Sequence, residues 1–136
     1  MKKISDKITQ INTFLAELDS IAPTDFKEYS SNLEKKAACE RYIEKIVEAT
    51  TDLAFLIIKL KRLRMPQDDT DAFNVLLENK IIPQELASKL KCAKGMRNIL
   101  SHQYGNIDDE IVFDSICQLD KDMKEFIELA KQYDEK

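Results

Sequence analysis

Residues 31–64 read SNLEKKAACERYIEKIVEATTDLAFLIIKLKRLR, a run that contains neither glycine nor proline. Apolar residues recur in this run at spacings of three and four, the pattern that lines one face of an α-helix. They are Cys39, Ile43, Ile46, Leu53, Ile57 and Leu60. At 1.5 Å per residue such a helix is roughly 45 Å long. The sequence therefore predicts one long helix that serves as the spine of a helical bundle.

The C-terminal half of this helix is apolar around almost its whole circumference, because Leu53, Phe55, Leu56 and Ile58 widen the stripe. A helix that is hydrophobic on all sides has to be covered on all sides. Two neighbouring helices of the same chain could cover it, or one side could meet a second subunit. The sequence leaves both arrangements open.

The same spacing predicts further helices over residues 4–18, 72–77, 86–100 and 111–130. Capping and stop signals separate them: Pro23, the turn 66–70, Pro83 and the pair Gly105-Asn106. Acidic residues 108–110 stand where the last helix would begin. That helix would bury Ile111, Phe113, Ile116, Leu119, Met123, Phe126, Ile127 and Ala130. We therefore predict an all-α, up-and-down bundle of four to five helices that forms one domain over residues 1–136.

Composition agrees with this fold class, since the chain has only two glycines, three prolines and no tryptophan, with 43% hydrophobic and 34% charged residues. A β protein would need many more turn residues. The longest apolar run, residues 53–58, is far shorter than the ~20 residues that cross a bilayer. Polar residues follow the N-terminal methionine where a secretory signal would have an apolar core. We expect no membrane association and a cytoplasmic protein.

Three cysteines, Cys39, Cys92 and Cys117, lie far apart in helical patterns where a small apolar residue would serve equally well. We expect them to be reduced and buried. A metal site would need clustered ligands at short spacing, and the sequence contains neither CxxC nor HxxxH. We expect neither a bound metal nor another cofactor.

Charge is distributed unevenly on a chain whose net charge is −4. Two stretches are basic: Lys59, Lys61, Arg62 and Arg64 in one, and Lys89, Lys91, Lys94 and Arg97 in the other. Residues 105–136 hold ten acids and four lysines, or −6. This asymmetry permits a local phosphate site on an acidic protein. Each lysine could equally belong to a solvated helix face.

The second basic stretch leads into Arg97-Asn98-Ile99-Leu100-Ser101-His102-Gln103-Tyr104, which holds the only histidine of the chain. Histidine exchanges protons near neutral pH, and arginine can fork onto phosphate oxygens. Taken singly, each residue also has an ordinary structural explanation: a helix C-cap for His102, a packed ring for Tyr104, and an amide that satisfies loop carbonyls for Asn98.

Helix geometry separates the two chemically active side chains. Five residues turn through about 500° on an ideal helix, so Arg97 and His102 would lie roughly 140° apart. Arg97 shares its azimuth with Leu86, Leu90 and Ala93, which places a cation on the buried stripe, where it needs a carboxylate, a helix-end carbonyl or a phosphate. The helix could end near Ser101, or the motifs of two chains could face each other in a symmetric dimer.

The whole stretch resembles the R-N-x-x-x-H-x-Y signature of HepT-type toxins, which belong to the HEPN superfamily of helical ribonucleases. The resemblance extends to residues 39–44 on the long helix, residues 73–77, Ile82-Pro83 and the acidic start of the last helix. It implies a metal-independent endoribonuclease that acts as a homodimer on RNA, with Arg97 and His102 as catalytic residues and Asn98 as a supporting polar residue.

The resemblance also implies regulation by a partner. A nucleotidyltransferase antitoxin of the MntA type would transfer AMP to the Tyr104 hydroxyl and so silence the toxin, in a complex that could be larger than the homodimer. The chemistry fits the residues themselves. His102 can accept the proton of an RNA 2′-OH, and Arg97 can stabilise the charge that builds on the phosphate. The alternatives are a non-catalytic helical module that binds the nucleotidyltransferase, and a purely structural helical protein.

Overall fold

The computed structural model describes residues 3–102 and 108–134, and six α-helices lie within them. They are α1 (Lys3–Ile21), α2 (Phe26–Ser31), α3 (Leu33–Leu60), α4 (Asp69–Glu78), α5 (Gln84–His102) and α6 (Asp109–Ala130), followed by the 3-10 turn η1 (Lys131–Tyr133). No β-strand occurs in these ranges, so the all-α class is confirmed. The count of four to five helices was wrong because α2 has only 6 residues, too few to show a helical period.

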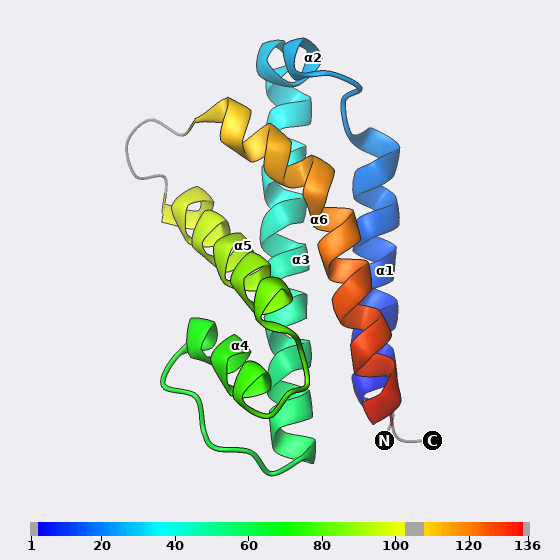
Figure 1. The fold of residues 1–136 in the computed structure, drawn as a ribbon. Helices are drawn as coiled ribbons and strands as arrows, with labels where there is room; N and C mark the ends of the chain where they lie inside the picture. Colours follow the sequence, from blue (N-terminus) through cyan, green and yellow to red (C-terminus); the bar gives the residue numbers. More distant parts are fainter. Residues whose placement is uncertain (1–2, 103–107, 135–136) are drawn as a thin grey trace.

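The four long helices alternate in direction (Figure 1). In the view of Figure 1, α1 and α5 run upward, whereas α3 and α6 run downward. The short helix α2 lies at the upper end, and α4 packs against α3 and α5 at the lower end. The up-and-down arrangement of the long helices is therefore the one that the sequence predicted.

The spine is α3, with 28 residues. It begins after Asn32, whose side chain accepts a hydrogen bond from the Lys35 amide at 3.0 Å. Its C-terminal half is covered by helices of the same chain, which bury Leu53 and Ile58. Phe55 and Leu56 remain half-buried. The first of the two arrangements left open by the sequence therefore accounts for most of this apolar surface.

Aspartate caps fix where α4 and α6 begin. Asp68 accepts a hydrogen bond from the Asp71 amide at 2.7 Å, and Asp108 accepts from the amides of Glu110 and Ile111. Such caps satisfy amides that have no partner within the helix. The capping predicted for the turn at residues 66–70 is confirmed, and so is the position of the acidic residues 108–110 at the start of the last helix. The predicted stop at Gly105-Asn106 lies outside the described residues.

Two predictions about burial are wrong. Ile111 is 54% exposed, because the buried stripe of α6 begins at Val112 and continues through Ile116, Leu119 and Met123, and Ile111 lies about 100° from it. Cys39 is buried as expected, but Cys92 and Cys117 are exposed. Both thiols stand in helices whose buried stripes are already filled by larger apolar side chains. None of the described helices is long and apolar enough to span a membrane.

Candidate active site

The described part of the motif, residues 97–102, lies at the C-terminal end of α5. Arg97 and Asn98 are within the helix, and His102 is its final residue. The His102 side chain and residues 103–107, with Tyr104 among them, are outside the described part of the structure. Because positions 97 and 102 belong to one continuous helix, their azimuths differ by roughly 140° and they rise about 7.5 Å along the axis. The helix thus does not end early enough to turn position 102 towards Arg97.

Arg97 is held only loosely by its surroundings. Its side chain is 26% exposed, and Nη2 lies 3.9 Å from a carboxylate oxygen of Glu48 on α3, which is beyond hydrogen-bond distance. The buried Nε has no hydrogen-bond partner among the described residues. Buried donors in folded proteins are almost always satisfied. The expected carboxylate is therefore present, but it leaves most of the guanidinium's hydrogen-bonding capacity unused.

Packing and ion pairs fix α5 against its neighbours. Leu86, Leu90 and Leu100 are buried, as the sequence predicted. On the side that faces α4, Lys94 is 7% exposed and its Nζ lies 3.1 Å from Asp69. These contacts hold the helix that carries Arg97 in a defined position.

The basic residues that lead into the motif contact side chains of α5 itself and of other helices. As a group they therefore form neither an open phosphate site nor a freely solvated helix face. Besides the Lys94 and Arg97 contacts, Lys91 donates a hydrogen bond to the Asn74 side chain at 3.0 Å. Lys89 lies 3.7 Å from Glu85 and 3.8 Å from Asp122. Lys89 and Arg97 are the two cations of this stretch whose carboxylate contacts are all beyond hydrogen-bond distance, and Arg97 also has a buried donor without a partner among the described residues.

A row of carboxylates on α3 was missed by the sequence analysis. Glu40, Glu44, Glu48 and Asp52 recur every four residues, which places them along one side of the helix. Glu48 faces Arg97, and Asp52 pairs with Lys7 of α1 at 3.3 Å. The four-residue spacing could have revealed this row in the sequence. It does not show which cation each carboxylate contacts.

The start of this row is partly desolvated. Burial raises the pKa of the Glu40 carboxyl above its ordinary value, and the nearby Asp109 carboxylate acts in the same direction. Lys36 lies 2.7 Å from Asp109, so it ties the start of α6 to α3. The buried hydroxyl of Tyr29 has no hydrogen-bond partner among the described residues, and burial raises the pKa of this phenol.

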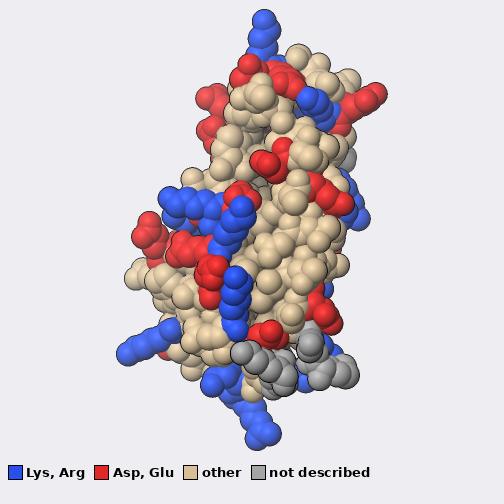
Figure 2. Space-filling view, turned by 90° about the vertical axis from the view of Figure 1, so that its right-hand side faces the viewer, with Lys and Arg blue, Asp and Glu red and all other residues tan. Residues whose placement is uncertain are grey.

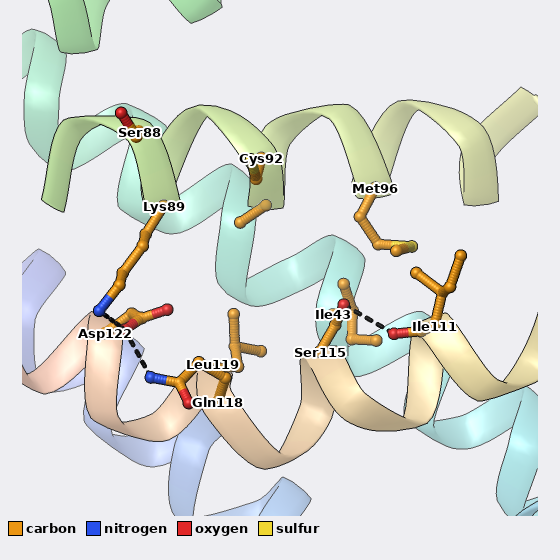
Figure 3. Close-up of a pocket in the computed structure, with 11 residues that line it drawn as sticks. Ile43, Ser88, Lys89, Cys92, Met96, Ile111, Ser115, Gln118, Leu119 and Asp122 are labelled. Carbon is orange, nitrogen blue, oxygen red and sulfur yellow. Dashed lines mark hydrogen bonds and ion pairs between the residues drawn. The ribbon is translucent and has the colours of Figure 1, made fainter. Parts of the chain in front are cut away.

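A groove of about 370 Å³ lies beside the motif helix, between α5 and α6 (Figure 3). Met96, Cys92 and Ile111 contribute to a wall that is mostly apolar. At one end Lys89 points from α5 towards Asp122, and Gln118 donates a hydrogen bond to the same aspartate at 3.2 Å. No cluster of three or more potential metal ligands occurs in residues 3–102 and 108–134.

A family model described as ribonuclease HepT-like matches residues 8–130. This range contains residues 97–104, the whole of α5, which carries Arg97, and the whole of α3, which carries Glu48. The chain belongs to the HepT-like ribonuclease family. The resemblance inferred from residues 97–104 is thereby confirmed for the family, whereas the roles of individual site residues remain predictions.

Two relatives of this HepT-like chain are named as nucleases. An mRNA nuclease HepT of Shewanella oneidensis is 33% identical over 89 residues, which are 65% of this chain and 67% of the relative. A tRNA nuclease HepT of Aphanizomenon flos-aquae is 27% identical over 113 residues, 83% of this chain and 77% of the relative. A solved structure of a tri-AMPylated Shewanella oneidensis HEPN toxin in complex with an MNT antitoxin aligns with a TM-score of 0.89 at 26% identity, covering 95% of this chain and 96% of that one.

Proposed function

We propose that this HepT-like protein is the toxin of a toxin–antitoxin pair and that it cleaves RNA without a metal ion, with residues 1–136 acting as one domain. Arg97 and His102 are the catalytic residues in this proposal, and Asn98 supports them. The observation that carries it is the half-buried guanidinium of Arg97, whose buried Nε has no partner among the described residues and which precedes the only histidine on the same helix. The names of the nuclease relatives support the same reaction class.

The proposed reaction is attack of an RNA 2′-OH on the adjacent phosphorus. His102 accepts the 2′-OH proton while the new bond from O2′ to phosphorus forms and the bond from phosphorus to O5′ breaks. The products are a 2′,3′-cyclic phosphate and a 5′-hydroxyl, whose proton comes from a protonated histidine. Arg97 compensates the negative charge that grows on the phosphoryl oxygens, and fixed charges of this kind are often the largest catalytic contribution.

A homodimer fits this chemistry because positions 97 and 102 diverge within one copy. Gly95, Ile99 and position 102 recur along one side of α5. Gly95 has no atom near the place where a Cβ would stand, and Ile99 is 43% exposed. Glycine inside a helix costs about 1 kcal/mol relative to alanine, yet it lets another backbone approach closely. In light scattering, Gly95→Leu should convert a dimer to a monomer, whereas a dimer that persists would exclude this interface.

Inhibition by a nucleotidyltransferase antitoxin of the MntA type follows from the same motif. AMP attached to the Tyr104 hydroxyl, two residues from the proposed base, would add bulk and negative charge at the substrate's phosphate site. The AMPylated Shewanella toxin supports this mode of control. With the antitoxin and ATP present, Tyr104→Phe should remain toxic while the wild type is silenced. If Tyr104→Phe is silenced equally well, inhibition acts by binding rather than by modification.

The nuclease proposal is tested with matched RNA oligonucleotides. One carries ribose throughout, and the other carries 2′-deoxyribose at the position where the first is cut. The wild type should cleave only the first, because the second lacks the attacking hydroxyl. Addition of EDTA should leave cleavage unchanged.

The control for this assay is His102→Ala, which should lose cleavage of the all-ribose RNA by roughly 10²-fold or more, as expected for removal of a general base. Cleavage of the 2′-deoxy RNA at the same position would exclude the proposed mechanism. A His102→Ala protein that inhibits growth as strongly as the wild type would instead favour a non-catalytic binding module.

A further inference from the structure

Helices α3 and α4 end in the same way. After α3, the Arg62 amide donates to the Lys59 carbonyl at 3.2 Å and the Leu63 amide donates to the Ile58 carbonyl at 3.0 Å. After α4, the corresponding bonds run from Lys80 to Leu77 and from Ile81 to Leu76. Both patterns are Schellman motifs, in which one residue adopts a left-handed backbone. Arg62, with φ 55°, and Lys80, with φ 58°, are these residues.

Long cationic side chains are poor choices for these positions. A left-handed backbone crowds Cβ in every residue except glycine, which is therefore the usual residue at this point. Arg62 and Lys80 are the only non-glycine residues with positive φ in the described ranges. Cations also stabilise the negative end of a helix, but Lys59 and Lys61 supply that charge to α3 without any backbone strain. The end of α3 thus does not explain why Arg62 is a cation, whereas Lys80 follows a helix, α4, whose last turn holds no other basic residue.

A salt-bridge clamp holds the two helix ends together. Arg64 donates from Nη1 to Asp71 at 2.8 Å and from Nε to Glu78 at 2.9 Å. Arg62 lies two residues before Arg64, and Lys80 lies two residues after Glu78. The clamp therefore joins the two helix ends after which these left-handed cations stand.

We call Lys59, Lys61, Arg62 and Lys80 the basic pole. All four are exposed, and within residues 3–102 and 108–134 none of them has a carboxylate oxygen within 4.0 Å. Two carboxylates of α4, Asp71 and Glu78, are engaged by Arg64. Figure 2 shows Lys and Arg side chains projecting from the lower end of the bundle. The cations on α5 differ, because each of them has a carboxylate or amide partner on its own or a neighbouring helix, whereas in the basic pole Lys61 lies only over the Tyr133 ring, 5.8 Å from its centroid.

We propose that the basic pole binds the sugar-phosphate backbone of the RNA substrate, at a site separate from the Arg97 motif. This inference rests on the proposed ribonuclease function. Glu48, which marks the position of Arg97 along α3, is twelve residues from the end of the helix at Leu60, or about 18 Å. One RNA strand can span that distance. Glu48 faces Arg97 and belongs to a row of four carboxylates on α3, which repels a polyanion, so part of the attraction for RNA has to come from elsewhere on the molecule.

Glycine substitution tests this proposal without endangering the fold. Arg62→Gly combined with Lys80→Gly removes two charges and at the same time relieves the left-handed strain, so its unfolding midpoint should equal or exceed that of the wild type. The probe is a fluorescent 24-nucleotide RNA of mixed sequence that is fully 2′-O-methylated, which prevents 2′-OH attack. Its binding is measured by anisotropy over a range of salt concentrations.

The double glycine variant should bind this RNA roughly tenfold more weakly near 0.1 M salt. Because each phosphate contact on a single strand contributes about 0.7 to the slope of log K against log salt, the slope should become shallower by about 1.4. The matched control is Lys121→Ala with Lys124→Ala on the exposed side of α6, which changes the net charge of the chain equally. The control should stay within about twofold of the wild type in affinity.

Equal losses in the two variants, or no loss in the glycine variant, would overturn the proposal. A glycine variant that keeps RNA binding but loses binding to vesicles of phosphatidylcholine and phosphatidylserine in equal parts would assign the pole to a membrane surface instead. The ribonuclease proposal is tested by a different measurement. It fails if the wild type does not cleave the all-ribose RNA. The methylated probe reports binding in either case.

Discussion

Arg64 and Arg97 are the same side chain in two opposite situations. Arg64 is 45% exposed and donates four hydrogen bonds, of 2.8 to 3.3 Å, to Asp71 and Glu78. Arg97 is more buried, at 26% exposed, yet its nearest carboxylate, Glu48, lies at 3.9 Å and its Nε has no partner among the described residues. The more buried guanidinium is thus the less satisfied one, the reverse of what stability alone would select.

The difference separates structural from functional use of a cation. A guanidinium that donates from all three of its nitrogens, as Arg64 does, holds two segments together and has little left for a ligand. A partly buried guanidinium with unused donors is costly until an anion arrives. A phosphate would supply the acceptors that Glu48 does not. Exchange of either arginine should therefore affect a different property of the protein.

The largest expected effect is on catalysis. Arg97→Ala should lower kcat/KM for RNA cleavage by roughly 10²- to 10³-fold, the range found when one charge-stabilising donor is removed. Its unfolding midpoint should change little, because the substitution leaves the exposed Glu48 in water. Arg64→Ala should show the reverse, with kcat unchanged and a lower midpoint in thermal melts.

Arg97→Lys refines this test, since it keeps the charge but loses the planar fork. Its rate should lie between those of Arg97→Ala and the wild type. The comparison of the two arginines fails if Arg64→Ala loses as much kcat as Arg97→Ala, or if Arg97→Ala melts at a much lower temperature than Arg64→Ala.

Most of the fold could be predicted because apolar residues recur every three or four positions along a long helix. Buried residues of α1, α3 and α5 recur at the predicted spacings, and Asp68 and Asp108 cap their helices as expected. The short helix α2 was missed, since its stability comes from the Asp25 cap and from packing of Tyr29 against Phe113 rather than from a repeat. The misplacement of Ile111 shows how a shift of one residue rotates a helix face by about 100°.

The site was less predictable, because its geometry depends on residues far apart in the chain. The position of Arg97 on the buried side of α5 followed from the sequence, and so did its need for an anion. Its partner Glu48 did not, because periodicity shows that a carboxylate row exists on α3 but not which helix it faces. Likewise the pairing of Lys94 with Asp69 depends on how α4 packs against α5.

A smaller effect should follow from changing the partner of Arg97. Glu48→Gln removes a negative charge that competes with substrate phosphate for the guanidinium while keeping the shape of the side chain. An exposed ion pair contributes about 0.2 to 1 kcal/mol, so RNA affinity should rise by up to about fivefold. Fluorescence anisotropy with the 2′-O-methylated RNA measures this change. Glu44→Gln, one turn away on the same carboxylate row, is the matched control, and an equal gain there would indicate general repulsion rather than competition at Arg97.

The smallest expected effect concerns the Arg64 clamp in acid. The Arg64 guanidinium holds the pKa of the Asp71 carboxyl well below its ordinary value of 3.8. Above that value the carboxyl is ionised in both the folded and unfolded states, and the clamp contributes fully. As the pH falls below about 4 the unfolded chain takes up a proton first, so the contribution shrinks until the folded carboxyl is protonated as well. Between pH 5 and pH 2.5 the melting temperature of the wild type should therefore fall by a few degrees more than that of Asp71→Asn.

The control is Asp120→Asn, which changes a carboxylate paired with the exposed Lys124 at 3.0 Å. Its melting temperature should fall as that of the wild type does. If all three proteins show the same fall in acid, the clamp adds nothing to stability.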